Sequence, residues 1–353
     1  MSSVRLALNI ASQDSGQADN QFLSIRSRNV RGSERRPSNS QDWYKIILMP
    51  SSTISPRIQG NLFAVLSMLI WATTYPITDV LLVTWDPLSL GMTRVLGGGI
   101  LLGLISILLG AARLPWRGWP IKQACVTGAV GLGLGTVLMN FGFLYSNPVN
   151  VAVIATTIPV ISVIMGMFRG EERLTLRIGI ALCFALAGGV LVSISNLETD
   201  MGFQGGELLM VIAVVLFTWF SRVSVIKLQA IPALPRAALT LVAAGITLLP
   251  ILLLIHWSGV FELSFSWHLS ELSLPVLLIF GVGFSMGFWV LSADRIGVTV
   301  AAIHINVVPF YVVILMLWFG GSLILTQIAG AILVAVGVIL AQITTRLNRS
   351  APQ

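Results

Sequence analysis

The chain has 353 residues, of which 56% are hydrophobic and only 10% are charged, and its mean hydropathy is +0.89. Soluble globular domains carry about 25% charged residues, so this composition excludes a soluble single domain. The net charge of +7 and the pI of about 10.1 would indicate a nucleic-acid partner in a soluble protein. The positions of the charges decide whether that interpretation holds.

The first 57 residues differ from the rest of the chain. They hold eight of the 21 basic residues and four of the 14 acidic ones, with much Ser, Asn and Gln and no sustained apolar periodicity. Such a segment cannot bury enough apolar surface to fold alone, and its one apolar stretch, IILM at 46–49, is too short for a secretory signal. We expect residues 1–57 to form a disordered basic tail, either solvated or with its arginines at a lipid surface. Met49 offers an alternative start, so whether residues 1–48 are translated stays open.

After residue 57 the sequence contains ten apolar stretches of about 20 residues, the length of a helix that crosses a hydrocarbon core. We therefore predict an all-α membrane protein with ten transmembrane helices. The weakest of the ten is the sixth, which is short and ends in Arg222. The predicted spans are 60–80, 88–110, 121–144, 150–168, 177–196, 206–222, 237–257, 274–292, 299–319 and 323–343.

The basic residues are distributed very unevenly among the predicted connections. Twenty of the 21 fall in the two tails and the even-numbered connections, whereas the odd-numbered connections hold acidic residues and no Lys or Arg. Lys and Arg near span ends stay on the cytoplasmic side, so both termini are predicted to be cytoplasmic and the number of spans even. The net charge is thus explained by membrane orientation, and we expect no nucleic-acid partner. Arg94, inside the second span, is the one basic residue left over.

The two halves of the sequence correspond at an offset of 150 residues. This offset aligns AVGLGLGTVLMNFGF (129–143) with IFGVGFSMGFWVLSA (279–293) and places Pro159 over Pro309. Because each half has five spans, the second half enters the bilayer in the opposite orientation, which gives two inverted-topology five-helix repeats, at 58–197 and 205–343, followed by a cytoplasmic tail at 344–353. Secondary transporters use this architecture, with the binding site at the repeat interface near the midplane.

Three pairs of glycines in the spans have the small-xxx-small spacing that lets membrane helices approach closely. They indicate tight helix packing and carry no functional prediction. The pairs are Gly99 and Gly103, Gly131 and Gly135, and Gly283 and Gly287.

Residues 60–343 resemble the drug/metabolite transporter superfamily, in particular its EamA-type ten-helix members. The resemblance is carried by LSMLIWATTYP, by DPLSLGMTRVLGGGILL, and by the ends of both halves from ATTIPVISVIMGMFRGEERL and AAIHINVVPFYVVILMLWFGG onward. It implies metabolite transport, commonly export, across a bacterial cytoplasmic membrane. The family's acidic residue before the last span of each half is present as Glu171 or Glu172 but is replaced around 320–322, so a role shared by both acidic positions is not expected.

Two ionisable side chains lie at membrane depth, where charge is costly and usually faces a cavity or a partner. Arg94 either binds a carboxylate or phosphate of the substrate or pairs with helix-end carbonyls, Asp79 or Asp86; its presence in the family motif across diverse substrates suits the second role. His304 either carries a proton during transport or is satisfied by a neighbouring carbonyl. No carboxylate lies deep in a span, which disfavours proton coupling through an acid.

Pro159 and Pro309 sit near the centres of the fourth and ninth spans. Each removes a backbone donor and frees the carbonyl four residues earlier, so we expect a hinge at each proline. The neighbouring hydroxyl and amide groups either form part of a substrate site or re-satisfy the broken helices. These polar residues are Thr156, Thr157 and Asn306, to which the third span adds Asn140.

Aromatic side chains complete the candidate binding set. Trp71 and Trp289 lie too deep to be interface anchors, and we expect them to line a cavity together with the neighbouring polar and aromatic groups of the first and sixth spans. Those groups are Thr74, Tyr75 and Trp219.

The leading functional hypothesis is a secondary transporter of the bacterial inner membrane that moves a small amphipathic metabolite, such as an amino acid, by alternating access. A passive channel is the alternative, and an intramembrane lipid-modifying enzyme or protease is a weaker one, because the spans hold one His, one Arg and no deep acid from which to build a catalytic group. The sequence contains no GxxxxGK[ST] nucleotide loop and no metal-ligand spacing. We therefore expect a multi-pass protein without catalytic residues, metal or cofactor, whose partners are a small molecule and the lipid bilayer. Substrate, coupling ion, direction and oligomeric state stay open.

Overall fold

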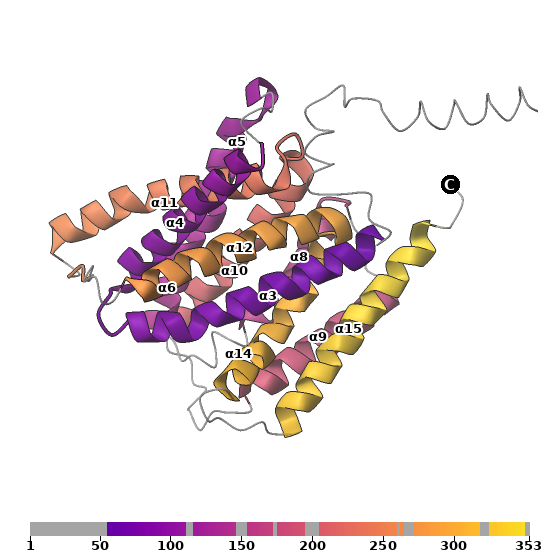
Figure 1. Ribbon diagram of the computed structural model, residues 1–353. Helices are drawn as coiled ribbons and strands as arrows, with labels where there is room; N and C mark the ends of the chain where they lie inside the picture. Colours follow the sequence, from indigo (N-terminus) through magenta and orange to yellow (C-terminus); the bar gives the residue numbers. More distant parts are fainter. Residues whose placement is uncertain are drawn as a thin grey trace, which may run out of the picture. The chain divides into compact units, whose positions relative to one another are not determined.

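The structure is a computed structural model, and every regular element in its described residues is a helix (Figure 1). The described residues are 55–110, 116–145, 154–171, 175–194, 205–259, 262–264, 272–317 and 325–349. Of the predicted tail at 1–57, residues 1–54 lie outside them, whereas Pro56 and Arg57 already belong to the first described helix. The α-helices are α3 (Pro56–Leu81), α4 (Pro87–Leu108), α5 (Ile121–Thr127), α6 (Gly135–Leu144), α8 (Ile158–Phe168), α9 (Leu176–Ile194), α10 (Gly206–Lys227), α11 (Ala233–Ser258), α12 (Ser273–Ile296), α13 (Val298–Ile303), α14 (Val308–Leu317) and α15 (Leu325–Arg349).

Each of the ten predicted spans contains helix in its described part. Among the described residues, six helices are long and apolar enough to cross a membrane, namely Pro56–Thr78, Pro87–Leu108, Ile121–Gly142, Gly206–Lys227, Ala233–Ser258 and Ser273–Ile296. Four further apolar helices are shorter: Ile158–Phe168, Leu176–Gly188, Val298–Val307 and Ile328–Gly337. The third span is continuous from α5 to α6 through a π-helical segment, Gly128–Leu134.

The predicted end of the sixth span at Arg222 is wrong. Helix α10 continues to Lys227, and Arg222 lies inside it with 3% of its surface exposed. Arg236, which we also placed in the following connection, lies in the first turn of α11 and is 1% exposed. Both guanidinium groups are buried against acidic partners, so neither charge marks a loop.

Helix α4 begins where the sequence provides a strong start signal. Asp86 is its N-cap, Pro87 follows, and the carboxylate of Asp86 accepts hydrogen bonds from the backbone N–H groups of Leu88 and Ser89, both at 2.9 Å. Side-chain acceptors at the N-cap satisfy donors that the helix leaves free. Asp86 also exchanges two hydrogen bonds with Ser264, at 2.7 and 3.1 Å, so the segment before α12 is tied to the start of α4.

The helices of the two halves pack in the same pattern. In this comparison α3 corresponds to α10, α4 to α11, the third span to α12, α8 to α13 and α14, and α9 to α15. Helix α3 packs along α12, and its counterpart α10 packs along the third span; α4 packs on α11, α8 on α13, and α9 on α15. Figure 1 shows the neighbouring α3 and α12 and the neighbouring α9 and α15. The packing therefore has the two-fold character that the duplicated sequence indicates.

The fourth span and its counterpart, the ninth, are both interrupted. Residues Thr156 and Thr157 form a turn before α8, and a 3-10 turn, His304–Val307, separates α13 from α14. Pro159 and Pro309 are the second residues of the new helices α8 and α14. We expected a kink within one helix, but a proline in the first turn removes no intrahelical hydrogen bond, and the N–H of Val308 bonds to the carbonyl of Ile305.

Glycines bring the two halves into backbone contact. A Cβ atom added to Gly99 would lie 2.7 Å from the backbone nitrogen of Val242, and one added to Gly131 would lie 2.4 Å from Cβ of Phe220. The other members of these two pairs are less crowded, because the nearest atoms would be 4.0 Å away at Gly103 and 3.7 Å away at Gly135. Thus one glycine of each of these pairs is needed for close approach, rather than both.

Alanine substitution along α4 tests this distinction. Gly99→Ala is expected to lower the melting temperature of the purified protein, because the new methyl group meets backbone atoms of α11 that cannot move aside. Gly103→Ala, one turn away in the same helix, is the matched control and is expected to be neutral or to stabilise by up to about 1 kcal/mol, the gain in helix propensity over glycine. Equal melting temperatures for the two variants would contradict the close packing of α4 on α11.

Candidate functional site

The interruption between α13 and α14 places one unsatisfied polar atom in the protein interior. Asn306 is 1% exposed, and its Nδ2 donates a hydrogen bond to the carbonyl of Ala185 in α9 at 2.9 Å. Its Oδ1 is buried and has no hydrogen-bond partner within the described part of the chain. A buried acceptor without a donor costs free energy, so this oxygen is a candidate contact for a ligand that carries an N–H or O–H group.

His304, at the start of the same turn, is satisfied by the backbone. It is 5% exposed, and its Nδ1 lies 3.0 Å from the carbonyl oxygen of Val300. Since a carbonyl only accepts, Nδ1 carries the hydrogen of this bond, and in the neutral ring Nε2 is then the acceptor. This is the arrangement expected for a histidine held by its own helix.

The equivalent interruption before α8 contributes hydroxyl groups. Thr156 is 2% exposed, and Thr157 is half-buried with its Oγ1 donating to the carbonyl of Ile154 at 2.6 Å. Helix α8 packs against α13, and Ser162 of α8 and Thr299 of α13 share a hydrogen bond of 3.0 Å. The two interrupted spans are therefore neighbours, with polar groups on both.

Of the candidate residues in the first span, Thr74 contributes to helix packing. Thr74 is 2% exposed, its Oγ1 donates to the carbonyl of Trp71 at 2.6 Å, and its methyl group faces Gly281 of α12. Trp71 is half-buried. The side chain of Tyr75 lies outside the described residues.

The two predicted tryptophans of the second half have different environments. Trp289 is 3% exposed, its Nε1 donates to Oγ of Ser221 at 3.2 Å, and its ring centroid lies 5.7 Å from that of Phe217. These contacts fix Trp289 between α10 and α12. Trp219 is half-buried and lines a cavity with residues of α5 and with Arg169, which follows α8.

Arg94 and Asn140 belong to the region around the start of α4. Asn140 is 7% exposed and its Nδ2 donates to the carbonyl of Pro87 at 2.7 Å, so it fastens α6 to the first turn of α4. Arg94 is half-buried on α4, two turns further along. The structure thus places the predicted residues in three neighbourhoods: the two interruptions, the packing of α3, α10 and α12, and the start of α4.

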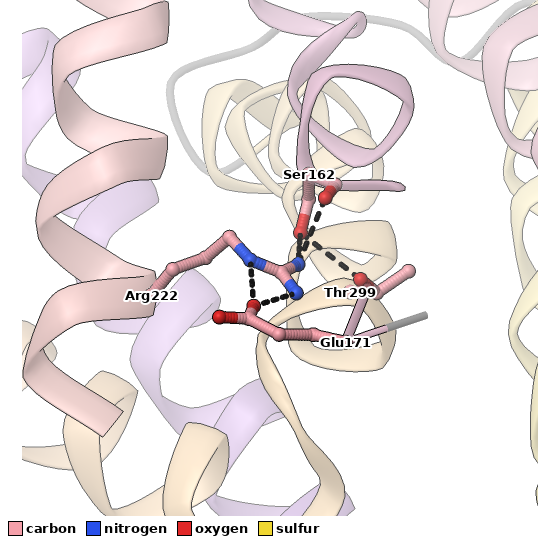
Figure 2. A network of polar contacts seen from close by, with 4 residues as sticks. All are labelled: Ser162, Glu171, Arg222 and Thr299. Atoms are coloured by element: carbon pink, nitrogen blue, oxygen red, sulfur yellow. Dashed lines mark hydrogen bonds and ion pairs between the residues drawn. The ribbon is translucent and has the colours of Figure 1, made fainter. Parts of the chain in front are cut away.

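A partly buried ion-pair network, which sequence reasoning missed, joins the two halves of the chain (Figure 2). The guanidinium of Arg222 in α10 contacts Oε2 of Glu171, after α8, with Nε at 3.2 Å and an amino group at 2.8 Å. Its other amino group donates to the carbonyl of Ser162 at 2.8 Å and to the hydroxyl at 3.2 Å. Ser162 in turn bonds Thr299, so four residues from both halves form one network.

A second buried arginine holds the second half together. Arg236 of α11 forms an ion pair with Asp294 of α12 and donates to the carbonyl of Ser224 in α10 at 2.9 Å. Arg295, which follows Asp294 in the sequence, lies 4.8 Å above the centre of the Phe63 ring in α3. The signal in the sequence that could have indicated these ion pairs is an arginine next to a predicted span end. If the fold buries such an arginine, its charge requires a partner.

The two partners of the Arg222 and Glu171 ion pair are unequally buried, with side chains 4% and 27% exposed. Glu171→Ala removes a carboxylate that the buried Arg222 guanidinium contacts and is expected to lower the free energy of unfolding by about 3 kcal/mol. Arg222→Met is expected to cost less, because water can solvate the remaining carboxylate and the methionine fills the space.

Denaturation of the purified variants in detergent measures both effects. The double variant, Glu171→Ala with Arg222→Met, serves as the control and is expected to resemble Arg222→Met alone. A larger loss for Arg222→Met than for Glu171→Ala would contradict the proposed dependence on burial.

Apolar helices of membrane-crossing length, packed around two interrupted helices, define the class of this chain as a multi-pass membrane protein. The sequence profile of the EamA-like transporter family matches residues 58–194 and again residues 204–342. The chain belongs to this family, as the sequence motifs indicated, and Glu171 is the acidic position of the first half that the structure places in an ion pair.

Related proteins agree with this assignment. The uncharacterized inner membrane transporter YedA of Escherichia coli K12 is 28% identical over 194 residues, which are 54% of this chain and 60% of YedA, and the YedA proteins of strains O6:H1 and O157:H7 give the same values. The match thus spans less than two thirds of these relatives. A solved structure described as "Crystal structure of protein" superposes with a TM-score of 0.68 at 21% identity, over 83% of this chain and 100% of the other, which shows a shared fold.

Proposed function

We propose that the protein is a secondary transporter that moves a small amphipathic metabolite across the bacterial cytoplasmic membrane by alternating access. The proposal includes ten membrane spans in two inverted-topology repeats with both termini in the cytoplasm. Three findings support it: membership of a transporter family, helix packing that repeats when the two halves are exchanged, and the absence of Lys and Arg from alternate connections of the sequence.

The observation that carries the proposal is the pair of interrupted spans. The equivalent helices of both halves break at Thr156 and Thr157 and at His304–Val307, and Asn306 holds a buried acceptor there that no donor of the described residues satisfies. Non-helical backbone at membrane depth is tolerated only within protein or around a cavity, and interrupted helices at the repeat interface commonly form transport sites.

The chemistry around the two interruptions favours a neutral or zwitterionic substrate. Thr156, Thr157 and Asn306 offer hydroxyl and amide groups, and helix α3, which contacts the second interruption, carries the aromatic side chain of Trp71. An amino-acid-like solute with an N–H donor for Oδ1 of Asn306 matches this set. Export is the direction that the family resemblance favours.

Movement of the two halves requires that the contacts between them change. Ser162 and Glu171 belong to the first half, whereas Arg222 and Thr299 belong to the second (Figure 2). We assign this network to the closure of the cytoplasmic side, because it lies where the fourth span ends in the basic connection that contains Arg169. Its opening would accompany the exposure of the site to the cytoplasm.

Solute flux into proteoliposomes tests the proposed function. With a panel of radiolabelled neutral and zwitterionic amino acids, we expect saturable uptake with counterflow for at least one solute. Asn306→Ala is expected to lower that flux at least tenfold, because about 1.4 kcal/mol of lost transition-state or binding energy corresponds to a factor of ten. Thr247→Val in α11, which loses a hydroxyl bonded only within its own helix, is the matched control and is expected to retain flux.

Two results would contradict the proposal. One is the absence of flux for every solute of a broad metabolite panel, and the other is flux that neither saturates nor shows counterflow, as in a passive channel. A thermal-shift measurement of Asn306→Ala separates lost transport from lost folding.

A further inference from the structure

The cavity that Trp219 lines is widely open to the surroundings, lies between α5, the end of α8 and α10, and has a volume of about 660 Å³. Its wall is built by residues 119 and 120 before α5, by residues 121–123, Val126 and Thr127 of α5, by Arg169 after α8, and by Trp219, Val223 and Lys227 of α10. Helix α5 and Arg169 belong to the first half and α10 to the second, so the cavity touches both.

The rim of the cavity is strongly positive. Lys122, Arg169 and Lys227 are all exposed and all line it, and no acidic residue lines it within the described part of the chain. Each cation stands at a helix end: Lys122 is the second residue of α5, Arg169 the C-cap of α8, and Lys227 the last residue of α10. Three like charges around one cavity repel each other unless an anion lies among them.

Deeper in the cavity the wall becomes apolar and aromatic. Val126 lies four residues beyond Lys122, which is about 6 Å along the helix, and Trp219 lies eight residues before Lys227, about 12 Å along α10. Val126 is 50% exposed and Trp219 is half-buried. An occupant that fits both parts has an anionic head and an apolar portion that extends toward the bilayer core.

We propose that this cavity binds an anionic phospholipid. The phosphate lies among Lys122, Arg169 and Lys227, and the first part of an acyl chain covers Val126 and Trp219. Basic pockets between membrane helices bind anionic lipid headgroups on the cytoplasmic side, which is the side that the proposed orientation gives to these three residues. The site is distinct from the two interruptions, and its occupant contacts both halves of the transporter.

Native mass spectrometry of the purified full-length protein in detergent tests the site by lipid titration. Phosphatidylglycerol is expected to bind at least tenfold more tightly than phosphatidylcholine with the same acyl chains. Lys122→Gln with Lys227→Gln is expected to weaken phosphatidylglycerol binding about 25-fold, since each basic residue near an anionic lipid contributes roughly a factor of five. Binding of phosphatidylcholine is expected to stay unchanged.

The matched control, Arg57→Gln with Arg177→Gln, removes two cations of the same predicted side that do not line the cavity, and it is expected to bind phosphatidylglycerol as the unaltered protein does. Glycerol 3-phosphate, the headgroup without its chains, is expected to bind weakly and to compete poorly. Three results would each overturn the proposal: equal affinity for the two lipids, an equal loss of phosphatidylglycerol binding in the control variant, or glycerol 3-phosphate binding as tight as that of phosphatidylglycerol. The last result would indicate a site for a soluble anion. None of these results depends on whether transport is observed.

Discussion

The structure depends first on the rule that a backbone N–H or C=O group in hydrocarbon must be hydrogen-bonded within the protein. Every regular element in the described residues obeys it by being helical. The two interruptions, at Thr156 and Thr157 and at His304–Val307, are the places where the rule requires compensation. There the neighbouring groups provide it: Thr157 bonds to the carbonyl of Ile154, and Val308 bonds to that of Ile305.

Contacts between the halves follow from the same environment. Lipid is as apolar as a leucine side chain, so association of membrane helices relies on close packing and polar contacts rather than on the hydrophobic effect. Gly99 and Gly131 allow backbone approach, and Arg222 with Glu171 supplies a charged contact from one half to the other. A buried ion pair is weak as a source of stability but costly to separate. It therefore suits a contact that closes one conformation and opens in another.

Sequence patterns predicted the helices well because hydropathy over about 20 residues reports membrane burial directly. The third span, predicted at 121–144, coincides with the helical run from Ile121 to Leu144. The predicted sixth span ends too early, at Arg222, because an arginine near a span end usually marks the cytoplasmic connection. Its partner Glu171 lies 51 positions away in the sequence, and such long-range pairing follows from the fold and not from local pattern. Likewise the prolines signalled interruptions, but only the structure shows that each begins a new helix.

Alternating access around the two interrupted spans can be measured most directly by the reactivity of a single cysteine introduced at Thr157. This position is half-buried at the first interruption. The native cysteines, Cys125 and Cys183, are first replaced by serine. The proposed transport cycle predicts that a membrane-impermeant maleimide reaches this cysteine from either face of the membrane, and that a transported solute protects it from both. A cysteine at Ser67, which is 1% exposed and bonded to the carbonyl of Ser285, should stay unreactive. Reaction from one face only, under all solute conditions, in a variant that keeps its melting temperature would contradict alternating access at this site.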